Sequence, residues 1–327
     1  MQKEIERELA LEFVRVTEAG ALACGRLMGM GDKEACDEAA VQAMRRALDT
    51  VDIDGAVVIG EGEMDEAPML YIGEKVGTGR GPRVDVAVDP LEGTTVLSKG
   101  LPRSMAVIAV AEQGCLFHAP DMYMDKLAVG PKARGRIDLD LPIEENLRSI
   151  AEGLQKNVFD LVVVILDRAR NRHLIDSVRK AGARIQLIPD GDLSPAIAVA
   201  FEDSGVDVLA GIGGAPEGVL AAAALRCLEG EMQARLWPTS PEEAERARTM
   251  GISDVRRKLT MDDLVKTDDV IFAATGVTNG ELLEGVRYIG SIAKTHSIVM
   301  RGATGTVRIV RASHRLDKKP LYVKAKA

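Results

Sequence analysis

The stretch Val86-Ala-Val-Asp-Pro-Leu-Glu-Gly-Thr-Thr95 decides the fold class and points to the chemistry of this chain. An apolar strand ends in Asp89, a proline redirects the chain, and Glu92 follows before a glycine and two threonines. Two carboxylates at the end of a buried strand, beside a hydroxyl that can hold water, suit a hard divalent cation such as Mg²⁺. Such an ion can neutralise phosphate oxygens and activate water. The stretch therefore predicts a metal site with hydrolytic chemistry at the end of a strand.

The composition is that of an ordinary globular protein. The 327 residues are 46% apolar and 28% charged, which allows a large core and two lobes. A net charge of -8 argues against general nucleic-acid binding, and no apolar stretch approaches the roughly 20 residues that span a bilayer. The four cysteines lack metal-binding spacing, and the charged N-terminus does not resemble a signal peptide. We therefore expect a cytoplasmic protein with no nucleic-acid or membrane partner.

Hydrophobic periodicity predicts alternating helices and strands. Helices are expected over 4–28, 33–48, 144–154, 172–181 and 195–201. Strands are expected over 56–59, 84–88, 105–110, 161–166, 184–188, 206–209, 270–274 and 307–309. The regular alternation after about residue 145 is typical of an α/β lobe in which helices cover a sheet.

Four acidic, glycine-rich segments end or interrupt the predicted strands, namely 60–66, 89–94, 189–192 and 211–218. Ligands in open α/β folds bind outside the carboxyl ends of strands, and glycines let backbone N–H groups approach an anion. Taken singly, each segment also has a structural interpretation. An Asp-Gly pair can be a simple turn, and the last segment can be a flexible loop that leads into a helix with Pro216 in its first turn. Four such segments in one chain favour a single shared site.

These motifs are similar to those of the class II fructose-1,6-bisphosphatases of the GlpX type, within the lithium-sensitive phosphatase superfamily. Residues 89–94 resemble the DPxDGT metal motif of the superfamily, with Glu92 in place of its second aspartate, as in the class II branch. The similarity continues through 60–79, 119–126, 188–192 and 211–218 and covers nearly the whole chain.

The resemblance implies an α/β fold, a layered α-β-α-β-α sugar-phosphatase-like sandwich with two lobes. Residues 1–150 would form the metal-binding catalytic lobe and residues 151–327 the sugar-phosphate-binding lobe, with the site between the two. It also implies two divalent ions, Mn²⁺ or Mg²⁺, as cofactors.

The metal ligands implied by the resemblance are five carboxylates. Asp37 and Glu61 would hold one ion, and Asp89, Glu92 and Glu217 would hold the other. From the residues alone, Asp37 is better explained as a solvated acid on a helix face.

Three further residues are implied as catalytic, namely Thr94, Asp65 and Lys33. Thr94 would orient or activate the attacking water, Asp65 would orient a ligand or activate water, and Lys33 would lie near the metals. Each also has a structural interpretation from the residues alone. The Thr94 hydroxyl could satisfy a turn, Asp65 could be an exposed loop acid, and Lys33 could be a surface lysine at a helix start.

The resemblance also implies a set of substrate-binding residues. Arg168 and Arg170 would grip a phosphate, and Tyr123, which we place in an acid-rich loop, would contact the substrate. The full set is Glu92, Gly93, Thr94, Tyr123, Arg168, Arg170, Asp190, Gly191, Asp192 and Gly214. From the residues alone, the two arginines equally suit a solvated helix start.

The activity implied is metal-dependent hydrolysis of fructose 1,6-bisphosphate to fructose 6-phosphate and phosphate, a step of gluconeogenesis in carbohydrate metabolism. A homodimer or homotetramer and lithium inhibition are expected on the same ground. Two alternatives stay open. The enzyme could act on another ester, such as sedoheptulose 1,7-bisphosphate or an inositol phosphate, or the chain could be a non-catalytic sugar-phosphate sensor on the same fold.

Overall fold

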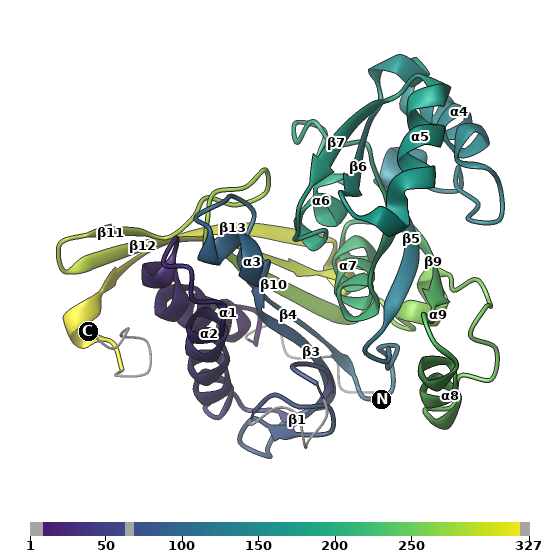
Figure 1. Ribbon diagram of the computed structural model, residues 1–327. Coiled ribbons are helices and arrows are strands. Elements are labelled where there is room, and N and C mark those ends of the chain that lie inside the picture. Colours follow the sequence, from purple (N-terminus) through teal and green to yellow (C-terminus); the bar gives the residue numbers. More distant parts are fainter. Residues whose placement is uncertain (1–8, 63–68, 321–327) are drawn as a thin grey trace. The chain divides into compact units, whose positions relative to one another are not determined.

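The chain forms two compact units (Figure 1), which the computed structural model describes over residues 9–62 and 69–320. The first unit comprises Met1–Leu116 and Thr267–Ala327, and the second comprises Phe117–Lys266. The chain therefore leaves the first unit, builds the second and returns. Our division at residue 150 differs from these units, because the last strands of the chain pair with strands near its beginning rather than with the second sheet.

A mixed sheet forms the base of the first unit, in the order β11-β12-β10-β4-β3-β1-β2, with β13 paired to β12. Strands β1 and β3 are parallel, and the other pairs are antiparallel. The bounds are β1 Asp54–Ile59, β2 Lys75–Val76, β3 Arg83–Glu92, β4 Met105–Glu112, β10 Val270–Gly276, β11 Arg287–Ile289, β12 Ile292–Arg301 and β13 Thr306–Arg315.

Two long helices, α1 (Leu9–Cys24) and α2 (Lys33–Leu48), pack on this sheet, and the short α3 (Thr94–Ser98) follows β3. Helix α2 begins where Asp32 accepts a 2.9 Å hydrogen bond from the Ala35 amide. That cap satisfies one of the amides left open at a helix start, and the predicted range of this helix is confirmed. Apolar side chains of both helices and of alternate strand positions form one core.

The second unit has its own five-stranded sheet, in the order β7-β6-β8-β5-β9. Strand β6 is parallel to both neighbours, whereas β5 is antiparallel to β8 and β9. The strands are β5 Tyr123–Val129, β6 Val162–Leu166, β7 Arg184–Ile188, β8 Val208–Gly214 and β9 Glu231–Trp237. The helices are α4 Ile143–Leu154, α5 Arg172–Ala181, α6 Leu193–Ala198, α7 Ala215–Cys227, α8 Pro241–Thr249 and α9 Met261–Leu264.

Helices cover both faces of this second sheet. Leu127 and Val129 of β5 belong to the core shared with α4 and α5. Met124 and Lys126 occupy the alternate positions of β5, whose side chains lie on the other face of the sheet, and they lie close to Gly218 of α7. The predicted α/β class is confirmed, with two sheets that helices cover in layers.

Several strands were not predicted, above all β5, β9 and β12. Tyr123, which we expected in a loop, is the first residue of β5. The last glycine-rich segment is likewise no loop, because β8 runs through Gly214 and α7 starts at the next residue with Pro216 in its first turn, as anticipated. Among the described residues, no helix combines the length and apolarity needed to cross a membrane.

Replacement of Phe13 by alanine tests the packing of α1 against the first sheet. The ring is fully buried in the core, so its removal should lower the free energy of unfolding by about 3–5 kcal/mol. Leu11→Ala is the matched control, because the Leu11 side chain on the same helix is 59% exposed and should change stability by less than about 0.5 kcal/mol. Equal losses in the two variants, measured by urea denaturation, would contradict this packing.

Candidate active site

The predicted acidic segments lie at or just past the carboxyl ends of strands. In the first unit, residues 60–62 follow β1, and residues 89–94 span the end of β3 and the start of α3. In the second unit, residues 189–192 follow β7, and residues 211–218 span the end of β8 and the start of α7. Residues 63–68, and with them the candidate Asp65, lie outside the described residues. Parallel strands end at the same edge of a sheet, so the segments after β1 and β3 start as neighbours.

Asp37 and Glu61 are brought together in the first unit. Asp37 lies on α2, and Glu61 follows β1, where its amide donates a 3.0 Å hydrogen bond to Leu70 O. The two side chains are hydrogen-bonded to each other. Burial raises the pKa of Asp37, and the hydrogen bond with Glu61 opposes that rise. Asp37 is therefore half-buried beside another acid, which favours the ligand interpretation over a solvated helix-face acid.

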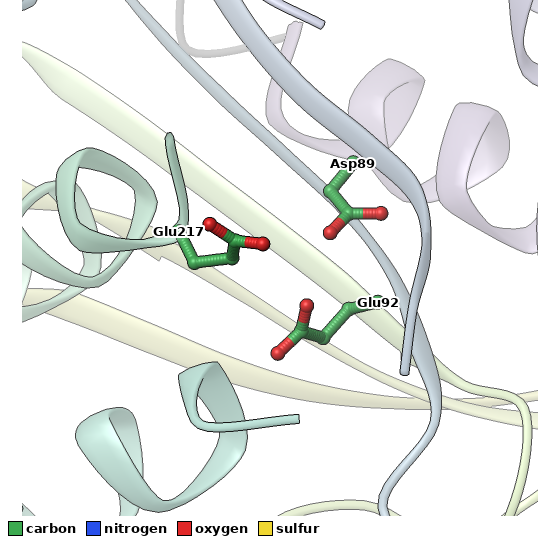
Figure 2. Close-up of side chains that lie close together, drawn as sticks. All are labelled: Asp89, Glu92 and Glu217. Carbon is green, nitrogen blue, oxygen red and sulfur yellow. The ribbon is translucent and has the colours of Figure 1, made fainter. Parts of the chain in front are cut away.

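Asp89 and Glu92 lie at a bulge in β3. In a regular strand, residues three apart point to opposite faces. The pairing of β3 with β4 shifts between these two residues, because Asp89 faces Val107 and Glu92 faces Met105. The extra residue turns both carboxylates to the same side, where one oxygen of each lies within 4.8 Å of the other. Figure 2 shows the two side chains converging from β3 and also labels Glu217.

The turn after this bulge fixes Thr94, Gly93 and the Asp89 carboxylate. Asp89 Oδ1 accepts a 3.0 Å hydrogen bond from the Leu91 amide. Gly93 caps α3 with a φ of 78°, a left-handed conformation that favours glycine. Thr94 Oγ1 donates a 3.1 Å hydrogen bond to Leu91 O, so this hydroxyl satisfies the turn and keeps its lone pairs for a water. Lys33 is the exposed first residue of α2.

Glu217 lies in the first turn of α7 in the second unit, with its carboxylate folded back over Gly214. A Cβ atom at Gly214 would lie 1.9 Å from Glu217 Oε2, so only glycine leaves room for this carboxylate. Burial raises the pKa of Glu217, the nearby Lys126 ammonium lowers it, and the Asp192 carboxylate raises it further. Within the described part of the chain, Glu217 Oε2 is buried with no hydrogen-bond partner.

Arg170 and Tyr123 form a stacked pair in the second unit. The guanidinium carbon lies 4.0 Å from the centre of the tyrosine ring, and Nε donates a 3.0 Å hydrogen bond to Ile212 O. The neighbouring Asn171 is buried and bonds both the amide and the carbonyl of Ile212. Arg170 is therefore held against β8 rather than extended into solvent as at a solvated helix start.

Arg168 and Asp190 lie beyond the ends of the parallel strands β6 and β7. Since Leu166 pairs with Ile188, both residues stand two positions past the last pair of the ladder. Arg168 Nη2 and Asp190 Oδ1 are 3.9 Å apart, and both side chains are partly exposed. Such a long, exposed pair contributes little to stability and leaves the guanidinium accessible to an anion.

The sequence analysis gave no role to Lys126, which lies between Asp192 and Gly214 in the second unit. Its side chain is fully buried in β5, and Nζ lies 2.6 Å from Asp192 Oδ2. The charged pair Asp125-Lys126 between apolar residues was the signal that could have drawn attention to it.

The donors fit divalent metal ions. Hard cations such as Mg²⁺ and Mn²⁺ take carboxylate oxygens, and the described residues supply Asp37 with Glu61, Asp89 with Glu92, and the unsatisfied oxygen of Glu217. Acids placed this close repel each other unless a proton or a cation lies between them.

Comparisons with known proteins show which family the chain belongs to. A family model described as "Bacterial fructose-1,6-bisphosphatase, glpX-encoded" matches residues 7–314. The chain belongs to this family. Two similar proteins are the fructose-1,6-bisphosphatase 1 class 2 of Escherichia coli K12 and the fructose-1,6-bisphosphatase class 2 of Shigella flexneri. Each is 49% identical to the chain over 328 residues, which cover 96% of this chain and 97% of the relative. The predicted resemblance is confirmed.

Asp37→Asn tests whether Asp37 and Glu61 bind a metal ion, by a measurement that does not depend on catalysis. Loss of one ligand carboxylate should remove one bound Mn²⁺ per chain and the stabilisation it gives, about 2.7 kcal/mol when free metal is 100 times its Kd. Equilibrium dialysis with Mn²⁺ measures the stoichiometry, and thermal unfolding with and without the ion measures the stabilisation.

Glu38→Gln is the matched control, because Glu38 is the next residue of α2 and its exposed side chain accepts a hydrogen bond from Gln42, one turn along the helix. The control should bind as much Mn²⁺ as the parent protein. An unchanged stoichiometry in Asp37→Asn would remove Asp37 from the ligand set.

Proposed function

We propose that the chain hydrolyses the C1 phosphate ester of fructose 1,6-bisphosphate, giving fructose 6-phosphate and phosphate. The observation that carries this proposal is the Asp89–Glu92 pair, which a β-bulge turns to one side at the end of β3 in a chain of the glpX-encoded family. The relatives are named as fructose-1,6-bisphosphatases, and the donor set suits the metal-assisted hydrolysis of a phosphate ester.

Asp37 and Glu61 would hold one divalent ion, and Asp89, Glu92 and Glu217 would hold another, with Mn²⁺ or Mg²⁺ as candidates. Bound there, the ions would polarise the phosphoryl group and lower the pKa of a water. The half-buried and buried settings of these acids support the assignment, because a buried carboxylate needs a counter-charge.

The Thr94 hydroxyl would accept a hydrogen bond from the attacking water, since its own proton is held by Leu91 O. Lys33 and Asp65 remain predicted contributors near this centre. The backbone of Gly93, at the start of α3, would face the phosphate.

Residues of the second unit would bind the rest of the substrate. Arg170, anchored by Ile212 and stacked on Tyr123, would pair with the second phosphate, together with Arg168. The segment Asp190-Gly191-Asp192 and the backbone of Gly214 would bind the sugar hydroxyls and phosphate oxygens. A sugar bisphosphate therefore has cations for both of its charged ends. A homodimer or homotetramer in the cytoplasm remains our prediction from the family resemblance.

Phosphate release from fructose 1,6-bisphosphate tests the proposal directly. Release should require Mn²⁺ or Mg²⁺ and stop in chelator. Glu61→Gln and Asp89→Asn should each abolish turnover, and Thr94→Ala should lower kcat by about 100-fold or more if the hydroxyl positions the water. Full activity in either carboxylate variant would overturn the metal assignment.

A substrate panel completes the test. Turnover of sedoheptulose 1,7-bisphosphate at a similar kcat/KM would make the enzyme bifunctional, whereas turnover of another ester alone would replace the proposed substrate. Binding of fructose 1,6-bisphosphate to folded protein without release under any of these metals would favour a sensor.

A further inference from the structure

Lys126 is a lysine with almost no access to solvent. It lies in β5 with 2% of its surface exposed and is among the largest fully buried side chains of the described residues. Lysine is almost never buried in this way unless its charge is paired, because an ammonium loses its hydration on burial. A buried lysine at this position therefore needs a specific reason.

Its ammonium joins two elements that are separate in the sequence. Nζ lies 2.6 Å from Asp192 Oδ2, at the start of α6, and donates a 3.1 Å hydrogen bond to Gly214 O, at the end of β8. Asp192 holds the N-cap position of α6, where an aspartate ordinarily bonds the helix amides. Its side chain makes no capping bond here and turns to Lys126 instead.

The backbone around the ammonium is shaped to receive it. A Cβ atom at Gly213 would lie 2.2 Å from Asp192 Oδ2 and 2.8 Å from Lys126 Nζ. A Cβ atom at Gly218, on α7, would come within 3.3 Å of Lys126 Cδ. The ion pair therefore lies directly against the backbone of two glycines. Strand β5 and helix α7 pack against each other in this unit (Figure 1).

We propose that Lys126 is a positioning residue for the proposed sugar-phosphate contacts of the second unit. By pairing with Asp192 Oδ2 it fixes the orientation of this carboxylate, and by donating to Gly214 O it fixes the end of β8. Lys126 itself is too buried to reach a ligand. The inference rests on the proposed function, in which Asp192 and Gly214 contact the substrate, and it adds that one internal cation sets both in place before the substrate arrives.

Lys126→Met keeps the length of the side chain and removes its charge. Asp192 then loses its counter-ion and its fixed orientation, so KM for fructose 1,6-bisphosphate should rise by about tenfold or more while kcat changes by less than about threefold. Lys126→Arg retains a cation and should recover part of the loss. Gly213→Ala keeps both Lys126 and Asp192 but places a methyl group where their charged ends lie, so it should raise KM in the same way as Lys126→Met.

Lys156→Met is the matched control. Lys156 makes a Lys–Asp pair of the same 2.6 Å length in the same unit, with Asp207. Its removal should lower the melting temperature and leave KM unchanged. A merely structural Lys126 would behave like this control, with a lower melting temperature and an unchanged KM.

Binding can also be measured without turnover. Trp237 is the only tryptophan of the chain and pairs with Tyr123 across β5 and β9, so its fluorescence should report fructose 1,6-bisphosphate bound in EDTA. The concentration of fructose 1,6-bisphosphate at the titration midpoint should rise at least about tenfold in Lys126→Met and stay unchanged in Lys156→Met.

The two measurements separate the two hypotheses. If the parent protein binds the sugar bisphosphate but releases no phosphate, the proposed hydrolysis fails, while a shifted midpoint in Lys126→Met still supports the positioning role. An unchanged KM and midpoint in folded Lys126→Met overturn that role. Should that variant fail to fold, Gly213→Ala decides, and parent-like values in it overturn the role as well.

Discussion

Repulsion between carboxylates gathered at strand ends is the constraint on which the rest of this structure depends. Asp89 and Glu92 offer oxygens within 4.8 Å of each other, and Asp37 and Glu61 share a hydrogen bond. Such groups separate unless the backbone holds them. In the first unit the sheet holds them. A bulge in β3 turns Asp89 and Glu92 to one side, and the Leu91 amide donates a hydrogen bond that fixes Asp89. The wide sheet and its two helices form a rigid base for acids that repel one another.

In the second unit a buried lysine reduces the repulsion between the acids. This unit gathers Asp192 and Glu217 around one buried ammonium, that of Lys126. One cation cannot balance two ionised acids, and burial raises the pKa of Glu217, whose Oε2 has no hydrogen-bond partner among the described residues. The second unit thus provides acids that one buried ammonium already partly neutralises. A divalent ion is a fitting counterpart to the acids of each unit.

What the sequence could predict was local. The range of α2 followed from its apolar spacing and its aspartate cap, and the acids at the ends of β1 and β3 followed from the rule for strand ends. Strand β5 was missed because Asp125 and Lys126 interrupt its apolar residues, so that no simple hydrophobic pattern marks it. The contact between Asp37 and Glu61 and the pairing of β10 with β4 join distant segments, so no local pattern could reveal them. The family resemblance supplied Asp37, which its own surroundings in the sequence did not.

The route of the chain also sets an order of assembly. The second unit is one continuous segment whose two ends meet, since the Phe117 amide bonds Leu264 O, and it can be completed during synthesis as soon as that segment has emerged. The first sheet lacks β10 and β12 until the last part of the chain is made. Until then β4, with its run of apolar residues, is an open edge, the kind of surface that recruits strands from other chains. A ribosome stalled beyond the second unit would therefore hold one finished unit beside an aggregation-prone half-sheet.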